Sequence, residues 1–209
     1  VGAVLGDICN AGGDPGRHPP GRGVWNCLVH LERSHRFESG SGIGALADAI
    51  RAGRHDRACQ VLDDDRWPDV RLVETQGLTG LEEVVAPLLR TDVAPCLEER
   101  DPQARLACFG RFRVLCAHRR GPYGVEQINP LCERLLGRAG AGAAAGPWYD
   151  GRPVLITRND HQLGLYNGDV GLVCREPASG ALRAFFPGHE EASPPARLPS
   201  HETVYAMTV

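Results

Sequence analysis

The first two thirds of the chain alternate between short apolar runs and segments in which apolar residues recur every three or four positions. Ile43, Leu46, Ala47 and Ile50 follow the second pattern, which predicts a helix that ends near Gly53. The same spacing predicts further helices around 81–89, over 103–111 and over 125–136, and residues 29–37 have the composition of a short strand.

Residues 113–136 are the part of this pattern that best defines a fold class. Residues 113–117 form a short apolar run typical of a buried parallel strand, and a loop rich in Gly and Arg follows over 118–124. Helical spacing then resumes over 125–136. Strand, loop and helix in this order form the repeating unit of α/β domains, so the sequence predicts an α/β architecture.

A linker of small residues over 137–147 separates this part from a segment with β character. Short runs of strand composition occupy 153–157, 168–174 and 182–186, and the sequence Tyr-Asn-Gly-Asp over 166–169 is typical of a hairpin turn. Closely spaced short strands predict a small barrel. The last eight residues, 202–209, predict one more strand.

Composition narrows the classes of protein that the chain can belong to. With 42% hydrophobic and 23% charged residues, it fits a soluble globular protein, and no apolar run reaches the ~18 residues needed for a membrane span. The first residues lack the pattern of a secretory signal, so we expect no membrane association and a cytoplasmic location. All 23 basic residues are Arg, which excludes mechanisms that require a lysine within this chain.

The net charge of −3 argues against a general nucleic-acid coat protein. Residues 105–160 nevertheless carry nine Arg against four acidic residues, and a basic segment of this kind can contact phosphates.

The eight cysteines show no Cys-x-x-Cys spacing, so the sequence predicts neither a disulfide framework nor a zinc site. Several lie in apolar stretches, where free thiols act as small core residues, and we expect them to be reduced and structural. Cys116 with His118 leaves open a nucleophile and base, and hence a cysteine hydrolase.

Several strings of residues resemble the RecD helicases, the α subunits of exodeoxyribonuclease V (RecBCD). Residues 31–37 (LERSHRF) and 41–47 resemble motif IV and the segment that follows it, and 1–8 resembles the stretch just after motif III. The resemblance continues at 115–129, 148–160 and 164–171, and residues 197–209 match the approach to motif V. The match is dense over 148–171 and loose over 55–105.

The resemblance implies a fragment of a superfamily-1 DNA helicase, running from after motif III to the start of motif V. Such enzymes hydrolyse ATP between two RecA-like domains and move 5′ to 3′ along single-stranded DNA. The implied parts are the end of the first RecA-like domain and a linker (1–28), part of the second motor domain (29–140), an inserted SH3-like β-barrel (147–200) and a return strand (201–209).

The resemblance also implies cofactors and partners, with restrictions set by the sequence. ATP and Mg²⁺ belong to the full-length parent, because the chain contains no Walker A or Walker B sequence and stops before motif V is complete. We therefore expect the fragment to be inactive alone, and we expect no metal site in it. RecB, RecC and single-stranded DNA are the implied partners, in DNA end resection and recombinational repair of double-strand breaks.

Two residues are implied to act on the nucleotide. Arg36 matches an arginine that reaches the γ-phosphate from the opposing domain and stabilises the charge of the transition state, so it is the implied catalytic residue. His35 stands where the family usually has a tyrosine that stacks on the adenine. Without the resemblance, Arg36 reads as a surface residue paired with Glu32 or Glu38.

A further set of residues is implied to contact the DNA strand. The loop 118–124 follows a strand at its C-terminal end, where α/β domains bind ligands, and its arginines and backbone amides can hold phosphates. Others lie on turns of the expected barrel or match the motif V threonine. The set comprises Arg119, Arg120, Tyr123, Arg158, Asn159, Asn167 and Thr208.

Two other functions remain open from the sequence besides the hydrolase. One is a stand-alone RecD-like helicase, and the other is a non-enzymatic β-barrel adaptor that binds nucleic acid or protein. The loop 118–124 also fits a solvated turn, and Asn167 with Gly168 fits an ordinary hairpin turn.

Overall fold

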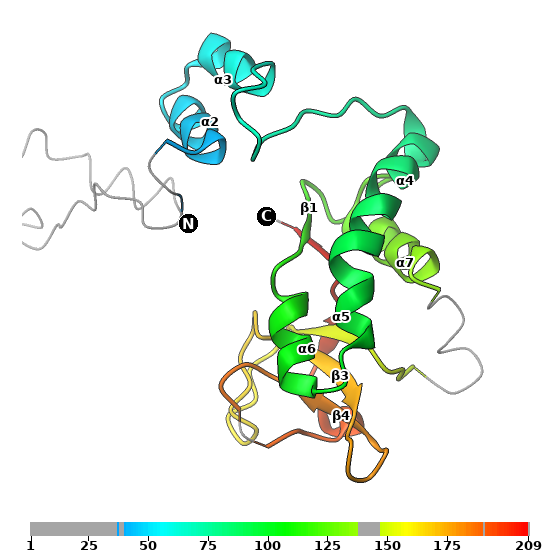
Figure 1. Cartoon of the computed structure of the whole chain (residues 1–209). Coiled ribbons are helices and arrows are strands. Elements are labelled where there is room, and N and C mark those ends of the chain that lie inside the picture. Colours follow the sequence, from blue (N-terminus) through cyan, green and yellow to red (C-terminus); the bar gives the residue numbers. More distant parts are fainter. Residues whose placement is uncertain (1–36, 38–39, 138–146, 190, 209) are drawn as a thin grey trace, which may run out of the picture. The chain divides into compact units, whose positions relative to one another are not determined.

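The computed structural model describes residues 37, 40–137, 147–189 and 191–208 (Figure 1). The chain divides into two compact units, residues 1–72 and residues 73–209. The predicted strand over 29–37 lies almost entirely outside the described residues.

In the described part of the first unit, α2 (Gly42–Arg51) and α3 (His55–Leu62) pack against each other. The helix predicted from the spacing of Ile43 to Ile50 is confirmed, and the chain leaves it through Gly53, whose φ of 64° favours glycine.

A residue that is distant in the sequence, Asp69, fixes the start of α2. The carboxylate of Asp69 accepts hydrogen bonds from the backbone amides of Gly42 and Ile43, both at 3.0 Å. Ser41 caps the same helix by accepting a bond from the amide of Gly44. Gly42 has no room for a side chain, because a Cβ there would lie 2.7 Å from the Cβ of Trp67.

The second unit begins with a long helical run and a shorter helix that follows it (Figure 1). The run consists of α4 (Gly77–Leu88), a π-helical turn η2 (Leu89–Val93) and α5 (Ala94–Glu98), and α6 (Pro102–Phe109) packs against α5 and η2. Two of the predicted helices, around 81–89 and over 103–111, are thereby confirmed with shifted ends.

The expectation that all cysteines are reduced is wrong. Cys96 on α5 and Cys108 on α6 form a disulfide, with their Cα atoms 5.5 Å apart. The pairing arises because the short connection between α5 and α6 folds the two helices against each other, a juxtaposition that sequence spacing does not reveal. Cys116, Cys132 and Cys174 are free and buried, as expected of core residues, whereas Cys59 is free and exposed.

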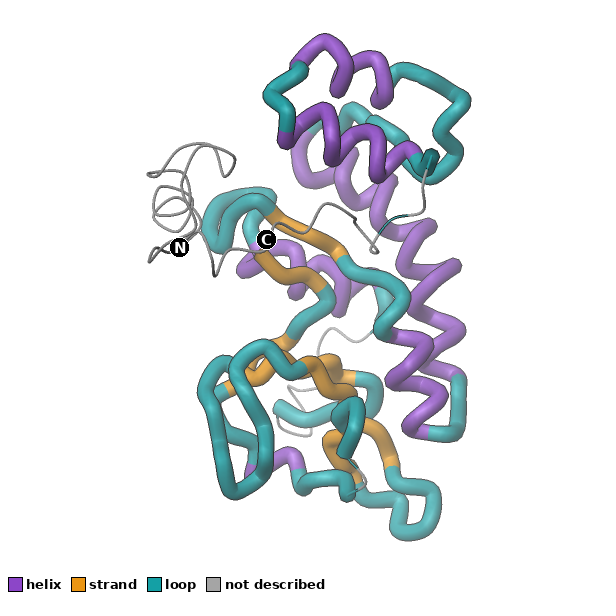
Figure 2. Tube along the Cα trace, turned by 90° about the vertical axis from the view of Figure 1, so that its left-hand side faces the viewer, coloured by secondary structure: helices purple, strands orange, loops and turns teal. Residues whose placement is uncertain are grey.

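The strand, loop and helix predicted over 113–136 are confirmed as β1 (Val114–Cys116), a loop and α7 (Val125–Leu135). β1 pairs in parallel with β6 (Ala206–Thr208), and Figure 2 shows the two strands side by side. Cys116 is opposite Thr208 in this register. The carboxyl ends of both strands therefore meet at one edge of the pair.

Four other strands form an antiparallel sheet in the order β4-β3-β2-β5. They are β2 (Arg152–Ile156), β3 (Val170–Arg175), β4 (Leu182–Phe185) and β5 (His201–Thr203), with a short 3-10 helix η3 (Pro195–Arg197) before β5. The predicted strands are confirmed, but the described residues do not close into a barrel, because β4 and β5 remain the two edges of the sheet.

Both faces of this sheet are covered, which explains the nearly continuous apolar run of β3. Leu172 and Cys174 belong to a core that includes buried residues of α6 and α7. Val173, between them, points into a second core with Val154 and Phe186. The sheet thus joins the helical layer through alternate residues of a single strand.

The predicted single strand over 202–209 is wrong, because the chain changes sheets within it. β5 ends at Thr203 and β6 begins at Ala206. Arg113 donates a hydrogen bond to the carbonyl of Val204 at 2.7 Å, and the buried Tyr205 donates to the carbonyl of Gly151. At the crossing, Arg113 thus satisfies the carbonyl of Val204, while the amide of Val204 still donates to the carbonyl of Pro153 at 3.2 Å.

Within the described part of the chain, no helix is both long and apolar enough to span a membrane.

Candidate nucleic-acid interface

The loop between β1 and α7 holds three of the seven predicted DNA-contacting residues, and Thr208 lies at the same edge. Its backbone closes on itself: the amides of Val125 and Glu126 donate to the carbonyls of His118 and Arg119, at 3.2 and 3.1 Å. Gly124 has no room for a side chain, because a Cβ there would lie 2.6 Å from the Arg119 carbonyl oxygen. The loop is therefore a tightly packed turn with a fixed path.

Three backbone amides at the end of this loop are engaged within the loop, so they are not the ones that could hold phosphates as expected. The amides of Gly124, Val125 and Glu126 are all bonded to carbonyls of the loop itself. The N-terminus of α7 consequently offers these donors to the loop rather than to an anion. At the start of α7, attraction for phosphate therefore has to come from side chains.

Two arginines of the loop differ in how strongly they are held. The guanidinium of Arg119 donates to both carboxylate oxygens of Glu202 on β5, at 3.3 and 2.5 Å. It also lies 3.8 Å from Glu126. The hydrogen bonds that Arg119 donates to Glu202 raise the pKa of Arg119 above its ordinary value, so this side chain is a permanent cation.

Arg120 has a weaker attachment than its neighbour. Its Nε lies 3.8 Å from the Glu126 carboxylate, and its side chain is 88% exposed. An ion pair this exposed contributes at most about 1 kcal/mol. Arg120 is therefore available to a ligand in the structure as it stands.

Thr208 and Tyr123 complete the group at this edge. Thr208 is exposed and lies opposite Cys116 in the parallel pair, at the end of β1 from which the loop emerges. Tyr123 lies in the loop and is 47% exposed. A hydroxyl, an aromatic ring and two guanidinium groups are thus presented near the carboxyl ends of two parallel strands.

Arg158, Asn159 and Asn167 form a second group on the antiparallel sheet. The side-chain oxygen of Asn159 accepts a hydrogen bond from the backbone amide of Asn167 at 2.8 Å, so these two residues join the segment after β2 to the turn before β3. The predicted turn is confirmed, with Gly168 at φ 101°. Asn159 therefore has a structural role in this turn, whereas Arg158 is exposed.

The implied nucleotide-binding residues His35 and Arg36 lie outside the described residues. Their roles stay predictions.

The nucleophile and base suggested by Cys116 and His118 do not fit the structure. Cys116 is buried in β1, and burial raises the pKa of its thiol, which keeps the thiol protonated. His118 is exposed in the loop beyond the strand. A buried, protonated thiol is a poor nucleophile, so the hydrolase interpretation is not supported.

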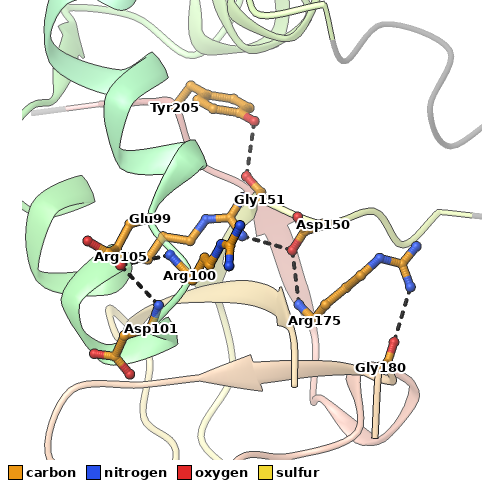
Figure 3. Close-up of polar contacts among 9 residues, drawn as sticks. All are labelled: Glu99, Arg100, Asp101, Arg105, Asp150, Gly151, Arg175, Gly180 and Tyr205. Carbon is orange, nitrogen blue, oxygen red and sulfur yellow. Dashed lines mark hydrogen bonds and ion pairs between the residues drawn. The ribbon is translucent and has the colours of Figure 1, made fainter. Parts of the chain in front are cut away.

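A polar cluster elsewhere in the second unit anchors the antiparallel sheet to α6 (Figure 3). Arg105 of α6 is 4% exposed and donates to Asp150 at 2.9 Å, and the same carboxylate oxygen accepts from the Arg175 amide. Gly151 leaves the space that Arg105 needs, since a Cβ there would lie 2.9 Å from its Nη2. The cluster holds the sheet in place.

Sequence reasoning missed the two acidic partners of the loop. Glu126 lies in the first turn of α7, within reach of the loop along the chain, so its position carried a local signal. Glu202 lies 83 residues from Arg119 in the sequence, and nothing in the pattern of the sequence connects the two. Among the described residues, no group of three or more His, Cys, Asp and Glu side chains is placed to hold a metal ion.

Comparison with known proteins gives relatives that match the chain along its length. The RecBCD enzyme subunit RecD of Mycolicibacterium smegmatis is 39% identical over 210 residues, covering 100% of this chain and 34% of that protein. RecBCD enzyme subunit RecD of Mycobacterium tuberculosis is 38% identical over 87% of this chain and 31% of its own length. An ATP-dependent RecD2 DNA helicase of Deinococcus radiodurans is 33% identical over 48% of this chain and 14% of its length.

These relatives define a class of RecBCD subunits and related DNA helicases. No family model matches the sequence. The chain belongs to the RecD family, and it spans about a third of the length of the curated RecD relatives. The longer and closer match to RecD than to the RecD2 helicase disfavours the stand-alone alternative, and the adaptor interpretation is disfavoured with it.

Proposed function

We propose that this chain supplies a DNA-contacting part of an ATP-dependent 5′–3′ DNA helicase subunit of the RecBCD type. The observation that carries the proposal is the register of β1 with β6, in a chain 39% identical to RecD over its whole length. This register sets Arg119, Arg120 and Thr208 at one edge of a parallel pair. Edges of this kind are where α/β domains bind their ligands.

In this proposal, the loop arginines and Thr208 contact the phosphates of single-stranded DNA, and Tyr123 supports a base by stacking. Arg158, with Asn159 and Asn167, contributes a second contact from the antiparallel sheet. The amides of Gly124, Val125 and Glu126 are bonded within the loop, so the proposed affinity comes mainly from the cations, and binding falls as salt rises.

The proposed domain division follows the resemblance, and the topology supports it. β1 and β6 pair directly, although all four strands of the other sheet lie between them in the sequence. We therefore treat 147–200 as an insertion of SH3-like type into a second RecA-like domain formed by 29–140 and 201–209. Residues 1–28 are assigned to the end of the first RecA-like domain and a linker.

ATP and Mg²⁺ are proposed for the full-length parent only. The described residues do not form a site that fits them, because they contain no metal-binding cluster and the chain has no Walker sequence. Arg36 is proposed to stabilise the transferring phosphoryl group, and His35 to stack on the adenine, both against nucleotide held by another part of the parent. The chain alone is expected to hydrolyse no ATP.

The remaining parts of the proposal rest on the names of the relatives. RecD of M. smegmatis is named as a subunit of the RecBCD enzyme, so we propose RecB and RecC as partners and DNA end resection and double-strand-break repair as the process. A cytoplasmic location goes with this assignment.

The test is the salt dependence of single-strand binding by the full chain. Replacing Arg119 and Arg120 together by Ala should weaken affinity for an oligothymidylate and reduce the slope of log K against log salt by up to about 1.4, at about 0.7 per phosphate contact. Arg90→Ala, which removes an exposed arginine from η2, serves as the control. An unchanged slope in the double variant would remove the loop from the DNA path.

A further inference from the structure

The contact between Arg119 and Glu202 has the geometry of a bound phosphate. Two guanidinium nitrogens, Nη1 and Nη2, donate to two carboxylate oxygens at 3.3 and 2.5 Å. A phosphate group offers the same pair of oxygens to the same face of the guanidinium. The Nη1 and Nη2 donors, one of the pairs with which Arg119 can hold a DNA phosphate, are therefore already occupied.

Glu202 is fixed more firmly than the arginine that it holds. It lies on β5, opposite Leu155 of β2, and its side chain is 28% exposed, against 57% for Arg119. The carboxylate is thus built into the sheet, whereas Arg119 reaches it from a loop. If the pair separates, the arginine is the side chain with freedom to turn towards solvent.

Glu202 is also the strongest of the acidic contacts at the loop. Glu126 lies 3.8 Å from Arg119 and 3.8 Å from Arg120, beyond hydrogen-bond distance in both cases. Arg119 and Arg120 supply the positive charge of the loop, and the amides at the start of α7 are bonded within the loop. Whether Arg119 is held by Glu202 or released decides how many cations face a ligand.

We infer that Glu202 competes with DNA phosphate for Arg119, so that Arg120 makes the first contact with the strand and Arg119 joins only when it leaves Glu202. This inference rests on the proposed function of the loop, and it adds a competing carboxylate that lowers the affinity of the loop for single-stranded DNA. Exchange is feasible because a partly exposed ion pair is worth little in water and phosphate offers the same donors a replacement. Glu202 thereby weakens single-strand binding rather than supporting it.

The experiment measures binding of a fluorescent oligothymidylate to the full chain at several salt concentrations. Glu202→Gln keeps the size of the side chain but removes its charge, so affinity should rise about three- to fivefold and the salt slope should steepen by about 0.7. Glu82→Gln is the matched control, because Glu82 forms the same forked contact with Arg134 on α7, at 2.9 and 3.1 Å. It should leave binding unchanged.

A double variant separates the possible outcomes. When Glu202→Gln is added to Arg119→Ala, affinity should rise by less than half as much as it does when Arg119 is present. The reason is that the double variant has no Arg119 to release. Equal gains with and without Arg119, or a matching gain in Glu82→Gln, would show a general charge effect and overturn the inference. If Glu202→Gln binds like the wild type while the double alanine variant of the loop binds weakly, competition is refuted and the loop keeps its proposed function. If neither changes binding, both proposals fail.

Discussion

The side-chain amide of Asn129 on α7 is hydrogen-bonded to both backbone polar groups of Ala206 on β6. Its oxygen accepts from the Ala206 amide at 2.7 Å, and its nitrogen donates to the Ala206 carbonyl at 3.2 Å. The neighbouring carbonyl, that of Tyr205, accepts from Val114 on the other side of the strand. Asn129 therefore acts as a one-residue strand partner on the edge of β6 away from β1.

Replacing Asn129 should destabilise the second unit. Asn129→Ala leaves the amide and carbonyl of Ala206, a residue that is 1% exposed, without these partners, at a cost of about 1–3 kcal/mol. Urea unfolding of the full chain measures the loss. Gln127→Ala, on an exposed position of the same helix, should change stability by less than about 0.5 kcal/mol. Equal effects of the two changes would contradict the role of Asn129.

The loop after β1 should not tolerate a side chain at Gly124. In Gly124→Ala, the new Cβ meets backbone atoms of Arg119 and Arg120 at 2.6–2.7 Å, so the turn has to open, at about 1–3 kcal/mol. We expect single-strand binding to fall at least tenfold. Gly180→Ala is a control of a different kind, since Gly180 has φ 68° and open space around it: it should cost some stability but leave binding unchanged. Normal binding by Gly124→Ala would disprove the fixed path of the loop.

The ion pair of Arg105 and Asp150 should respond unequally to loss of each partner. Asp150→Ala leaves a guanidinium whose side chain is 5% exposed without its carboxylate, and we expect a loss of about 3–5 kcal/mol. Arg105→Met leaves a carboxylate that is 30% exposed and still bonded to the Arg175 amide, so the loss should be smaller. Chemical unfolding of both variants gives the comparison. A larger loss for Arg105→Met would contradict this order.

Thiol reactivity should follow burial. Burial raises the pKa of Cys132 to about 12 and that of Cys174 to about 11, so both thiols stay protonated up to pH 9. Iodoacetamide reacts with the thiolate, so it should leave both residues unmodified in this range. Only above pH 10 should their alkylation begin, provided that the chain remains folded. Cys59 is exposed and should react at pH 8. Mass spectrometry of each site gives the result, and alkylation of Cys132 at pH 8 in the folded chain would refute the buried assignment.

Arg36 should be required for turnover rather than for nucleotide binding. If it stabilises the transferring phosphoryl group, Arg36→Ala in the full-length parent should lower ATP hydrolysis by about 10³-fold or more, while ATP binding changes little. Steady-state hydrolysis and equilibrium binding of a fluorescent nucleotide measure the two quantities. Near-normal hydrolysis would remove Arg36 from the site.

Local patterns in the sequence predicted most of the helices and strands. The helix from Ile43 to Ile50, the unit over 113–136 and the turn at Gly168 all depend on spacing or on backbone preferences of nearby residues, and these were confirmed. Such features arise within a few residues of the chain, so a single sequence contains the information.

The features that the sequence did not predict depend on contacts between distant segments. Cys96 and Cys108 pair because two helices fold together, and Glu202 reaches Arg119 because β5 lies beside the loop after β1. The break between β5 and β6 is stabilised by Arg113, far away in the sequence. Residue spacing carries no record of these contacts, although the residue types involved are common in such roles.

One consequence follows from the way the chain crosses between the two sheets. Glu202, which binds Arg119 of the loop, and Thr208, which lies beside the loop, are on the same short segment of backbone. Hydrogen bonds at Val204 and Tyr205 fix the crossing between them. A chimaera that exchanges the antiparallel sheet for that of another family member would thus also replace Glu202, while leaving Thr208 in place. In the proposed function, a change on β5 can then alter affinity for the strand while Arg119, Arg120 and Thr208 stay the same.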